Sequence, residues 1–193
     1  MKLVLASASP RRRELLEATG LKIEIRPVCV DETIHAHESP QQAVQRLARL
    51  KAVQGHEENP DRFVLAADTI VVCNGRIMGK PKTIGEAGQM LGALSGRSHQ
   101  VITGFAVVSP QGETSIQSVS TKVVFKNLCK EEIDWYIKTD EPMDKAGAYG
   151  IQGKAAALVK SVHGSYTNVV GLPLAETLEL LAHAGWKGFP PGE

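Results

Sequence analysis

The part of this chain best suited to bind an anion is a short run of small residues followed by arginines. Residues 5–13 read LASASPRRR, in which serine and alanine stand between an apolar stretch and a proline that can open a helix. N–H groups at a helix N-terminus attract phosphate, small side chains permit close approach, and arginine can hold oxygens with two donors at once. The run therefore indicates a phosphate site. A solvated basic turn between a strand and a helix is the alternative that these residues leave open.

Two charged side chains fall where the pattern predicts apolar surroundings. Asp68 lies within the run AADTIV (66–71), where an unpaired carboxylate is costly. A metal ion, a lysine, or a capping or turn role would each satisfy it. Lys51 falls at helical spacing on the apolar stripe that contains Val44 and Leu47, so its ammonium group must leave that stripe at a cleft or an edge. A lysine that extends along the surface into solvent is the alternative explanation.

Other segments carry potential ligands in weaker patterns. Residues 31–38 read DETIHAHE, but the two histidines are too close together for a helical pair of zinc ligands, and we expect them to be solvated loop residues. The carboxylates of this segment suit Mg²⁺ or Mn²⁺ better. Lys80 lies in a turn bounded by glycine and proline, where an ordinary polar loop is the alternative. The glycine-rich stretches 147–154 and 164–173 lack GxGxxG, so structural turns explain most of their glycines.

The composition limits the classes of function. The 193 residues include 22 basic and 21 acidic side chains, a net charge of +1, which argues against a dedicated nucleic-acid binder but allows a local phosphate site. Three cysteines, far apart and without a CxxC pair, predict reduced thiols and an intracellular protein. No apolar run approaches the roughly 20 residues that a membrane-spanning helix needs. We therefore expect a cytoplasmic protein that binds neither membranes nor nucleic acid.

Alternating strand-like and helix-like segments predict a mixed α/β fold, an elongated twisted sheet with flanking helices, in one domain (residues 1–193). Helix starts are clearest at Ser39, where Gln42 completes a capping box, and at Thr83, where Glu86 completes another. Helices are expected at about 10–19, 39–55, 83–95, 130–139 and 174–184. Strands are expected at 2–6, 63–67, 69–73, 100–108, 115–125 and 155–162. Asp68 is predicted to separate two of these strand-like runs.

Eight short motifs follow one another in an order that resembles the Maf family. They are ASxSPRR, DE, a helical KA, AADTIV, GKP, TGF, GAYGIQG and GSYxNVVGLP. Each motif is weak alone, but together they span nearly the whole chain. The resemblance implies an α/β fold of two lobes that share one central active-site cleft, related in shape to the inosine triphosphate pyrophosphatases, and commonly a homodimer.

The same resemblance implies a nucleoside triphosphate pyrophosphatase that hydrolyses dTTP and UTP, and 5-methyl-UTP as well, to the monophosphate and pyrophosphate. It also implies a role in nucleotide clearance and in cell division arrest. By motif, Asp68 is the catalytic base or a metal ligand, and Glu32 shares a Mg²⁺ or Mn²⁺ ion with it. The positions implied to bind substrate are Ser7, Arg11, Lys51, Thr69, Lys80 and Gln152. Family members often have glycine where this chain has Ala8, whose methyl group would narrow the phosphate loop slightly.

The expected base preference depends on Gln152. Its amide offers one donor and one acceptor, which complement N3–H and O4 of uracil and thymine, although a flipped amide could equally read cytosine. A glutamate at this position would offer acceptors only, which suits guanine, and is associated with the branch of the family that hydrolyses 7-methyl-GTP. An enzyme for 7-methyl-GTP or another modified nucleotide is one alternative hypothesis. A nucleotide-binding regulator of septum formation without turnover is another.

Overall fold

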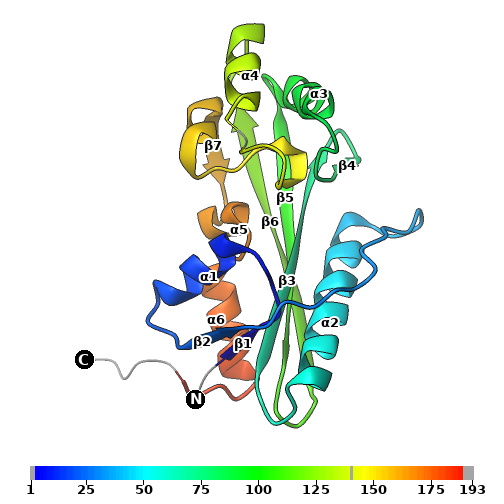
Figure 1. Ribbon diagram of the computed structural model, residues 1–193, viewed down its shortest axis with the longest axis vertical. Coiled ribbons are helices and arrows are strands. Elements are labelled where there is room, and N and C mark those ends of the chain that lie inside the picture. The colour runs from blue at the N-terminus through cyan, green and yellow to red at the C-terminus, as the bar shows by residue number, and fades with distance from the viewer. Residues whose placement is uncertain (1–2, 140, 189–193) are drawn as a thin grey trace. The chain divides into compact units, whose positions relative to one another are not determined.

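The computed structural model describes residues 3–139 and 141–188, which form a mixed α/β structure (Figure 1). Its strands are β1 (Leu3–Leu5), β2 (Ile23–Ile25), β3 (Val64–Cys73), β4 (Arg76–Met78), β5 (Ser98–Val108), β6 (Thr114–Phe125) and β7 (Val159–His163). They make one seven-stranded sheet in the order β2-β1-β3-β5-β6-β7, with β4 paired to β3 outside that path. β1 runs parallel to β2 and β3, whereas the β3–β4 and β6–β7 pairs are antiparallel.

Helices connect most of these strands. They are α1 (Pro10–Glu17), α2 (Pro40–Glu58), α3 (Ile84–Leu94), α4 (Lys130–Ile137), α5 (Tyr166–Val170) and α6 (Leu174–His183), with 3₁₀ helices η1 (Ala146–Ala148) and η2 (Gly153–Leu158). Within the described part of the chain, no helix combines the length and the apolar character needed to cross a bilayer.

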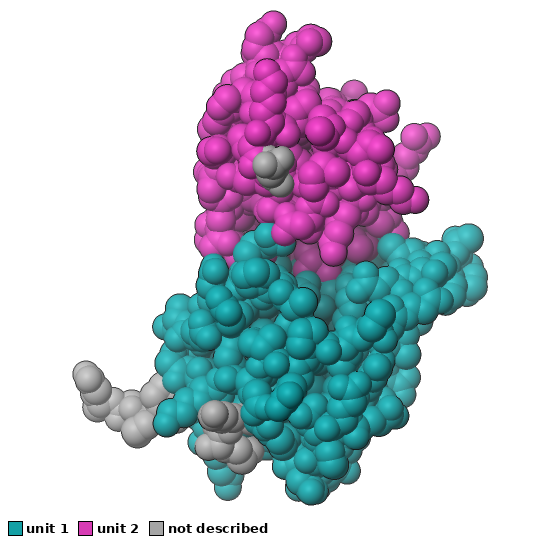
Figure 2. All heavy atoms as spheres, viewed as in Figure 1, with its two compact units in different colours: residues 1–68, 103–119, 171–193 teal, residues 69–102, 120–170 magenta. Residues whose placement is uncertain are grey.

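The chain divides into two compact units, which Figure 2 colours separately. Unit 1 consists of residues 1–68, 103–119 and 171–193, and unit 2 consists of residues 69–102 and 120–170. β3, β5 and β6 each contribute residues to both units. The cut in β3 falls between Asp68 and Thr69, two of the residues that the sequence singles out.

Unit 1 is built on strands that bury both of their faces. In β1, Leu3 and Leu5 belong to one apolar cluster, whereas Val4 belongs to another, because successive side chains of a strand point to opposite faces. The first cluster includes residues of α1 and α6, and the second includes residues of α2. Figure 1 shows these helices on opposite sides of the unit 1 strands. Burial on both faces explains why β1 and the first half of β3 read as continuous apolar runs.

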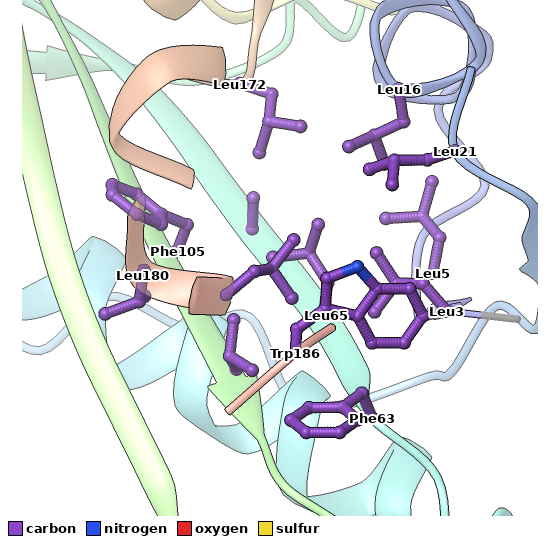
Figure 3. Packing of buried hydrophobic residues seen from close by; sticks show 13 residues of the cluster. Leu3, Leu5, Leu16, Leu21, Phe63, Leu65, Phe105, Leu172, Leu180 and Trp186 are labelled. Carbon is purple, nitrogen blue, oxygen red and sulfur yellow. The ribbon is translucent and has the colours of Figure 1, made fainter. Parts of the chain in front are cut away.

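A tryptophan near the end of the described chain packs into the apolar cluster that includes residues of α6. The rings of Trp186 and Phe63 meet edge to face with centroids 5.3 Å apart, and Leu65 lies beside them (Figure 3). Trp186 is 3% exposed. The segment between α6 and Trp186 is therefore packed into the core.

The glycine of the TGF motif lets α2 approach the sheet closely. A Cβ atom placed on Gly104 would lie 2.4 Å from the backbone carbonyl atoms of Val44, a distance that no packed structure tolerates. Gly104 is in β5, and Val44 is in the first part of α2. Any side chain at position 104 would push this helix away from the strand.

Two of the predicted helix starts can be compared atom by atom. At α2 the capping box is complete, because Ser39 Oγ accepts from the N–H of Gln42 and the Gln42 side chain accepts from the N–H of Ser39. At α3, Thr83 Oγ1 accepts from the N–H of Glu86, but Glu86 accepts from the N–H of Lys82 instead of closing the box. The second box is thus only half formed.

The structure corrects two predictions about elements and adds elements that were not predicted. β3 is continuous from Val64 to Cys73, so Asp68 does not separate two strands. The strand expected at 155–162 starts only at Val159, because residues 153–158 form the 3₁₀ helix η2. The short strands β2 and β4 and the helix α5 were not expected.

Candidate active site

Lys51 joins two carboxylates within unit 1. Its Nζ atom lies 2.7 Å from Oδ1 of Asp68 and 2.6 Å from Oε1 of Glu32. The Lys51 and Asp68 side chains are 11% and 14% exposed, whereas that of Glu32 is 57% exposed. One ammonium group therefore balances a largely buried carboxylate and an accessible one.

Regular secondary structure positions the buried pair. Asp68 stands in the middle of β3 between two buried stretches, and Lys51 lies on α2 beside the buried residues Ala48 and Ala52. Of the three partners considered for Asp68, the structure contains the lysine, and it excludes the turn or capping role. The ammonium of Lys51 leaves the apolar stripe to form ion pairs. A charge in the interior of a strand is tolerated here because α2 supplies the opposite charge.

The serine and arginine run contains a second polar group in unit 1. Ser7 is buried, and its Oγ accepts hydrogen bonds from Nη1 of Arg12 at 3.1 Å and from the N–H of Ser9 at 3.3 Å. Nε of Arg12 donates to the carbonyl oxygen of Gly171 at 2.8 Å. The N-cap of α1, Ser9, forms no side-chain capping bond, so Ser7 makes the main hydroxyl contact of this loop.

Arg12 is a further candidate, beside Arg11, that the sequence motifs did not single out. It precedes the fully buried Leu16 by four residues, and residues at this spacing share one face of a helix. That spacing was the signal in the sequence that could have identified it.

The charges around Ser7 interact with one another. Burial lowers the pKa of the Arg12 guanidinium, and the positive charge of Arg11 lowers it further. The carboxylates of Asp68 and Glu32 act in the opposite direction and raise it. An arginine remains protonated despite such a shift. Unit 1 thus contains five residues of the predicted site, which are Ser7, the cationic Arg11 and Lys51, and the anionic Glu32 and Asp68.

The Asp68 and Glu32 carboxylates fit a hard divalent cation. Both have an oxygen within hydrogen-bond distance of the same Lys51 nitrogen, so a positive charge already bridges them. Mg²⁺ is commonly held by one or two carboxylates, with waters and substrate phosphates as its other ligands. No group of three His, Cys, Asp or Glu side chains that could hold a metal occurs among residues 3–139 and 141–188. His35 and His37 are exposed loop residues whose rings stack with centroids 6.0 Å apart.

The remaining candidates belong to unit 2. Thr69 follows Asp68 directly in β3 and is partly buried, whereas Lys80 and Gln152 are exposed loop residues. The loops of Lys80 and Gln152 are tied together, because the N–H of Gly147 donates to the carbonyl oxygen of Gly79 at 3.0 Å. Unit 2 therefore unites the GKP and GAYGIQG motifs.

Buried neutral side chains support the loop that leads to Gln152. Tyr149 Oη lies 2.6 Å from Nε2 of His99, and the N–H of Gly150 donates to Oη of Tyr136 at 3.3 Å. Burial lowers the pKa of His99 to about 4 and raises the pKa of Tyr149 above its usual range, so both are neutral near pH 7. Ala148, the last residue of η1, has a positive φ of 59° that few non-glycine residues adopt. This strained turn is held by its surroundings.

The asparagine of the GSYxNVVGLP motif has a structural role in unit 2. Nδ2 of Asn168 donates to the carbonyl oxygen of Val101 at 3.0 Å and to Oγ1 of Thr121 at 2.9 Å. Asn168 is fully buried, and these bonds tie α5 to β5 and β6. Asn168 thus links three elements of unit 2 through its side chain.

Comparison with known proteins identifies the family. Residues 2–184 match a family model described as Maf-like protein. A protein of Geobacillus sp. (strain WCH70) named dTTP/UTP pyrophosphatase is 52% identical over 185 residues, which cover 96% of this chain and 99% of that protein. A protein of Moorella thermoacetica with the same name is 51% identical over 185 residues, which cover 95% of each chain.

A solved structure shares the fold at much lower identity. The HAM1 protein from Coxiella burnetii is 19% identical, has a TM-score of 0.53, and matches over 95% of this chain and 99% of its own. This likeness confirms the predicted mixed α/β class. With a family model that matches residues 2–184 and relatives that are half identical along nearly their whole length, the chain belongs to the Maf family.

Proposed function

We propose that this protein is a nucleoside triphosphate pyrophosphatase that hydrolyses dTTP and UTP, and accepts 5-methyl-UTP, to give the monophosphate and pyrophosphate. The observation that carries the proposal is the bridging of Asp68 and Glu32 by Lys51, in a chain half identical to proteins named dTTP/UTP pyrophosphatase. Those names do not favour 7-methyl-GTP as the substrate or a regulator without turnover.

In the proposed reaction, a water molecule attacks the α-phosphorus, the bond from this phosphorus to the α–β bridging oxygen breaks, and pyrophosphate leaves. Asp68 accepts the proton of the attacking water, and Lys51 holds the carboxylate in place through its 2.7 Å ion pair. Asp68 and Glu32 would together hold Mg²⁺ or Mn²⁺. When bound, this ion would neutralise phosphate charge and make the attacking water more acidic.

The cationic side chains stabilise the charge that develops on the phosphates. In unit 1 these are Arg11, Arg12 and Lys51, with Ser7 as a neutral donor, and in unit 2 we assign the same role to Lys80. Arg12 is fixed by its bonds to Ser7 and Gly171, so little reorganisation is needed when the substrate binds. Thr69 is proposed as a further substrate contact beside the catalytic carboxylate.

Gln152 is proposed to read the base through paired donor and acceptor atoms. Thymine and uracil share N3–H and O4, which explains why one glutamine would admit both, as well as 5-methyl-UTP. One nucleotide carries both the triphosphate and the base. We therefore propose that the two units act on one substrate within a single functional domain.

The proposal extends to the state of the protein in the cell. We infer a cytoplasmic homodimer that clears nucleotides, with an associated effect on cell division. The three cysteines, Cys29, Cys73 and Cys129, are free thiols, which supports a reducing compartment. Sedimentation of the purified protein would test the dimer.

The test of the activity is a panel of nucleoside triphosphates, including CTP, GTP and 7-methyl-GTP, with Mg²⁺ or Mn²⁺. We expect pyrophosphate release to be fastest with dTTP and UTP and to be abolished in Asp68→Asn, with the variant still folded. Hydrolysis in ¹⁸O-water should place the label in the monophosphate, because the α-phosphorus is attacked. Label in the pyrophosphate, or wild-type turnover by Asp68→Asn, would refute the mechanism.

A further inference from the structure

The exposed loop around Glu32 does not by itself hold the Glu32 carboxylate at one position. It lies in the irregular segment between β2 and α2, and its side chain is 57% exposed. An exposed ion pair contributes little stability and leaves a long side chain free to change rotamer. If Glu32 is to meet a cation at a defined place, the backbone on either side of it must be held.

A tight turn fixes the backbone around Glu32. Oδ1 of Asp31 accepts from the N–H of Thr33 at 2.9 Å and from Oγ1 of Thr33 at 2.6 Å. Glu32 is the single residue enclosed by this turn, whose side-chain oxygen replaces a backbone acceptor.

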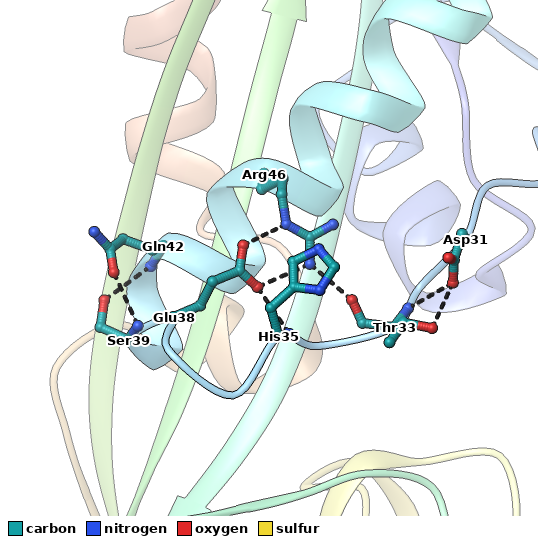
Figure 4. A network of polar contacts seen from close by, with 7 residues as sticks. All are labelled: Asp31, Thr33, His35, Glu38, Ser39, Gln42 and Arg46. Carbon is teal, nitrogen blue, oxygen red and sulfur yellow. Dashed lines mark hydrogen bonds and ion pairs between the residues drawn. The ribbon is translucent and has the colours of Figure 1, made fainter.

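Arg46 anchors this turn to α2. Its Nη2 donates to the carbonyl oxygen of Thr33 at 2.8 Å and to Oε2 of Glu38 at 2.9 Å, and its Nε donates to Oε1 of Glu38 (Figure 4). Glu38 in turn accepts from the N–H of His35 at 3.1 Å. One guanidinium group thus contacts two residues of the segment, Thr33 and Glu38, and its bidentate bond to Glu38 has a geometry that a lysine cannot reproduce.

The Arg46–Glu38 pair persists over the working pH range. Its hydrogen bonds lower the pKa of Glu38 to about 2, and Glu38 is 11% exposed at the side chain. Arg46 lies on the same helix as Lys51, which contacts the carboxylate of Glu32 directly. α2 therefore holds Glu32 twice, by its side chain through Lys51 and by its backbone through Arg46.

We propose that Arg46, paired with Glu38, is a positioning residue that holds Glu32 ready to bind the divalent cation. This inference rests on the proposed function, since it concerns the ligand of that reaction. Loss of groups that orient a metal ligand typically weakens metal binding 10- to 100-fold. A role limited to the stability of the fold would lower the Tm and leave the Kd for the cation unchanged.

The experiment measures Mn²⁺ binding by electron paramagnetic resonance of the free ion, with the full chain and α,β-imido-dUTP, a nucleotide that resists cleavage. Glu32→Gln provides the reference loss. We expect Arg46→Ala and Arg46→Lys to raise the Kd for Mn²⁺ at least about tenfold. Arg49→Ala, an exposed arginine of the same helix, is the matched control and should leave the Kd unchanged.

Kinetics separate positioning from a simple folding defect. At saturating Mn²⁺, Arg46→Lys should recover most of the wild-type kcat with an unchanged KM for dTTP, and its Tm should remain near that of Arg49→Ala. If Glu32→Gln weakens Mn²⁺ binding and both Arg46 variants do not, the inference is overturned while the proposed function stands. A wild-type protein that releases no pyrophosphate from any nucleotide would instead refute the proposed function.

Discussion

The charged group of unit 1 and the loop that carries Gln152 in unit 2 are held by different forces. In unit 1, Lys51 on a helix pairs with a carboxylate in the interior of a strand. In unit 2, the chain reaches Gln152 through η1 and irregular residues. The neutral side chains of Tyr136, Tyr149 and His99 support the residues before Gln152, and Oε1 of Glu141 accepts from the N–H of Lys154 at 3.3 Å just after it. One region is held by ion pairs between regular elements, and the other mainly by neutral side chains beneath a loop.

The difference matches what each region is proposed to recognise. Phosphates carry charge, so their ligands must be charged, and charged ligands need opposite charges nearby to remain partly buried. A base is neutral, so its recognition depends on the direction of hydrogen bonds, which a rigidly supported amide provides. Changes in unit 1 should therefore alter turnover most, and changes below the loop should alter stability or base preference.

The largest effect is expected from Lys51→Met. Methionine has a similar length but no charge, so Asp68 and Glu32 would face each other without the ammonium that bridges them. We expect kcat/KM for dTTP to fall about 100-fold or more, the range seen when one preorganised charge contact is removed. Initial rates of pyrophosphate release measure this. A loss below about tenfold would show that the bridge is dispensable and that charge does not organise unit 1.

The next largest expected effect is a loss of folding stability at acidic pH, which originates in His99. Its folded pKa is lowered to about 4 from an ordinary 6.5, so between these pH values the unfolded chain binds the proton more readily. The neutral His99 therefore contributes about 3 kcal/mol to the free energy of unfolding above pH 6.5, and this contribution is lost as the pH falls to 4.

His99→Gln isolates this contribution because glutamine does not titrate. Denaturant unfolding of both proteins at pH 7 and at pH 4.5 should show a smaller loss for the variant. Equal losses in the two proteins would mean that His99 is not held neutral, and that the support of the loop is not the uncharged one described above.

A smaller effect, confined to base preference, is expected from Gln152→Glu. The carboxylate would place an acceptor against O4 of thymine, at a cost of roughly 2 kcal/mol with dTTP. The ratio of kcat/KM for dTTP to that for GTP should fall correspondingly. Gln111→Glu adds the same charge at an exposed turn and should leave the ratio unchanged. If both variants behave alike, Gln152 does not read the base.

Local patterns explain why much of the fold could be predicted. The apolar runs of β1 and β3 and the capping box at Ser39 depend on neighbours within a few residues, and each was found where expected. The family motifs located Lys51 and Asp68, and the structure places them in contact.

Long-range partners explain what could not be predicted. The sequence treats Asp68 as a break in a strand, because the lysine that neutralises it is 17 residues away on another element. The sequence did not identify Arg46 as a candidate, because its partners are a backbone carbonyl and a glutamate that only the folded loop brings near. Residues 153–158 are rich in alanine, which fits a short helix as well as a strand, and packing decided between the two.

The smallest predicted effect, from Tyr149→Phe, tests the neutral support of the Gln152 loop most directly. The change removes only the hydroxyl that lies 2.6 Å from Nε2 of His99. Since Nδ1 of His99 has no hydrogen-bond partner among the described residues, the buried imidazole would then lose its side-chain bond. We expect the free energy of unfolding to fall by about 1 kcal/mol.

Base preference should change in the same variant, because a less firmly held loop lets the Gln152 amide turn toward cytosine. The ratio of kcat/KM for dTTP to that for CTP should fall several-fold in Tyr149→Phe, while turnover of dTTP at saturation changes little. Tyr166→Phe, which alters a tyrosine that is 50% exposed, should keep both stability and preference. A variant Tyr149→Phe that loses stability but keeps the full dTTP preference would show that the buried pair supports the fold without orienting Gln152. The contrast between the two units would then be one of stability alone.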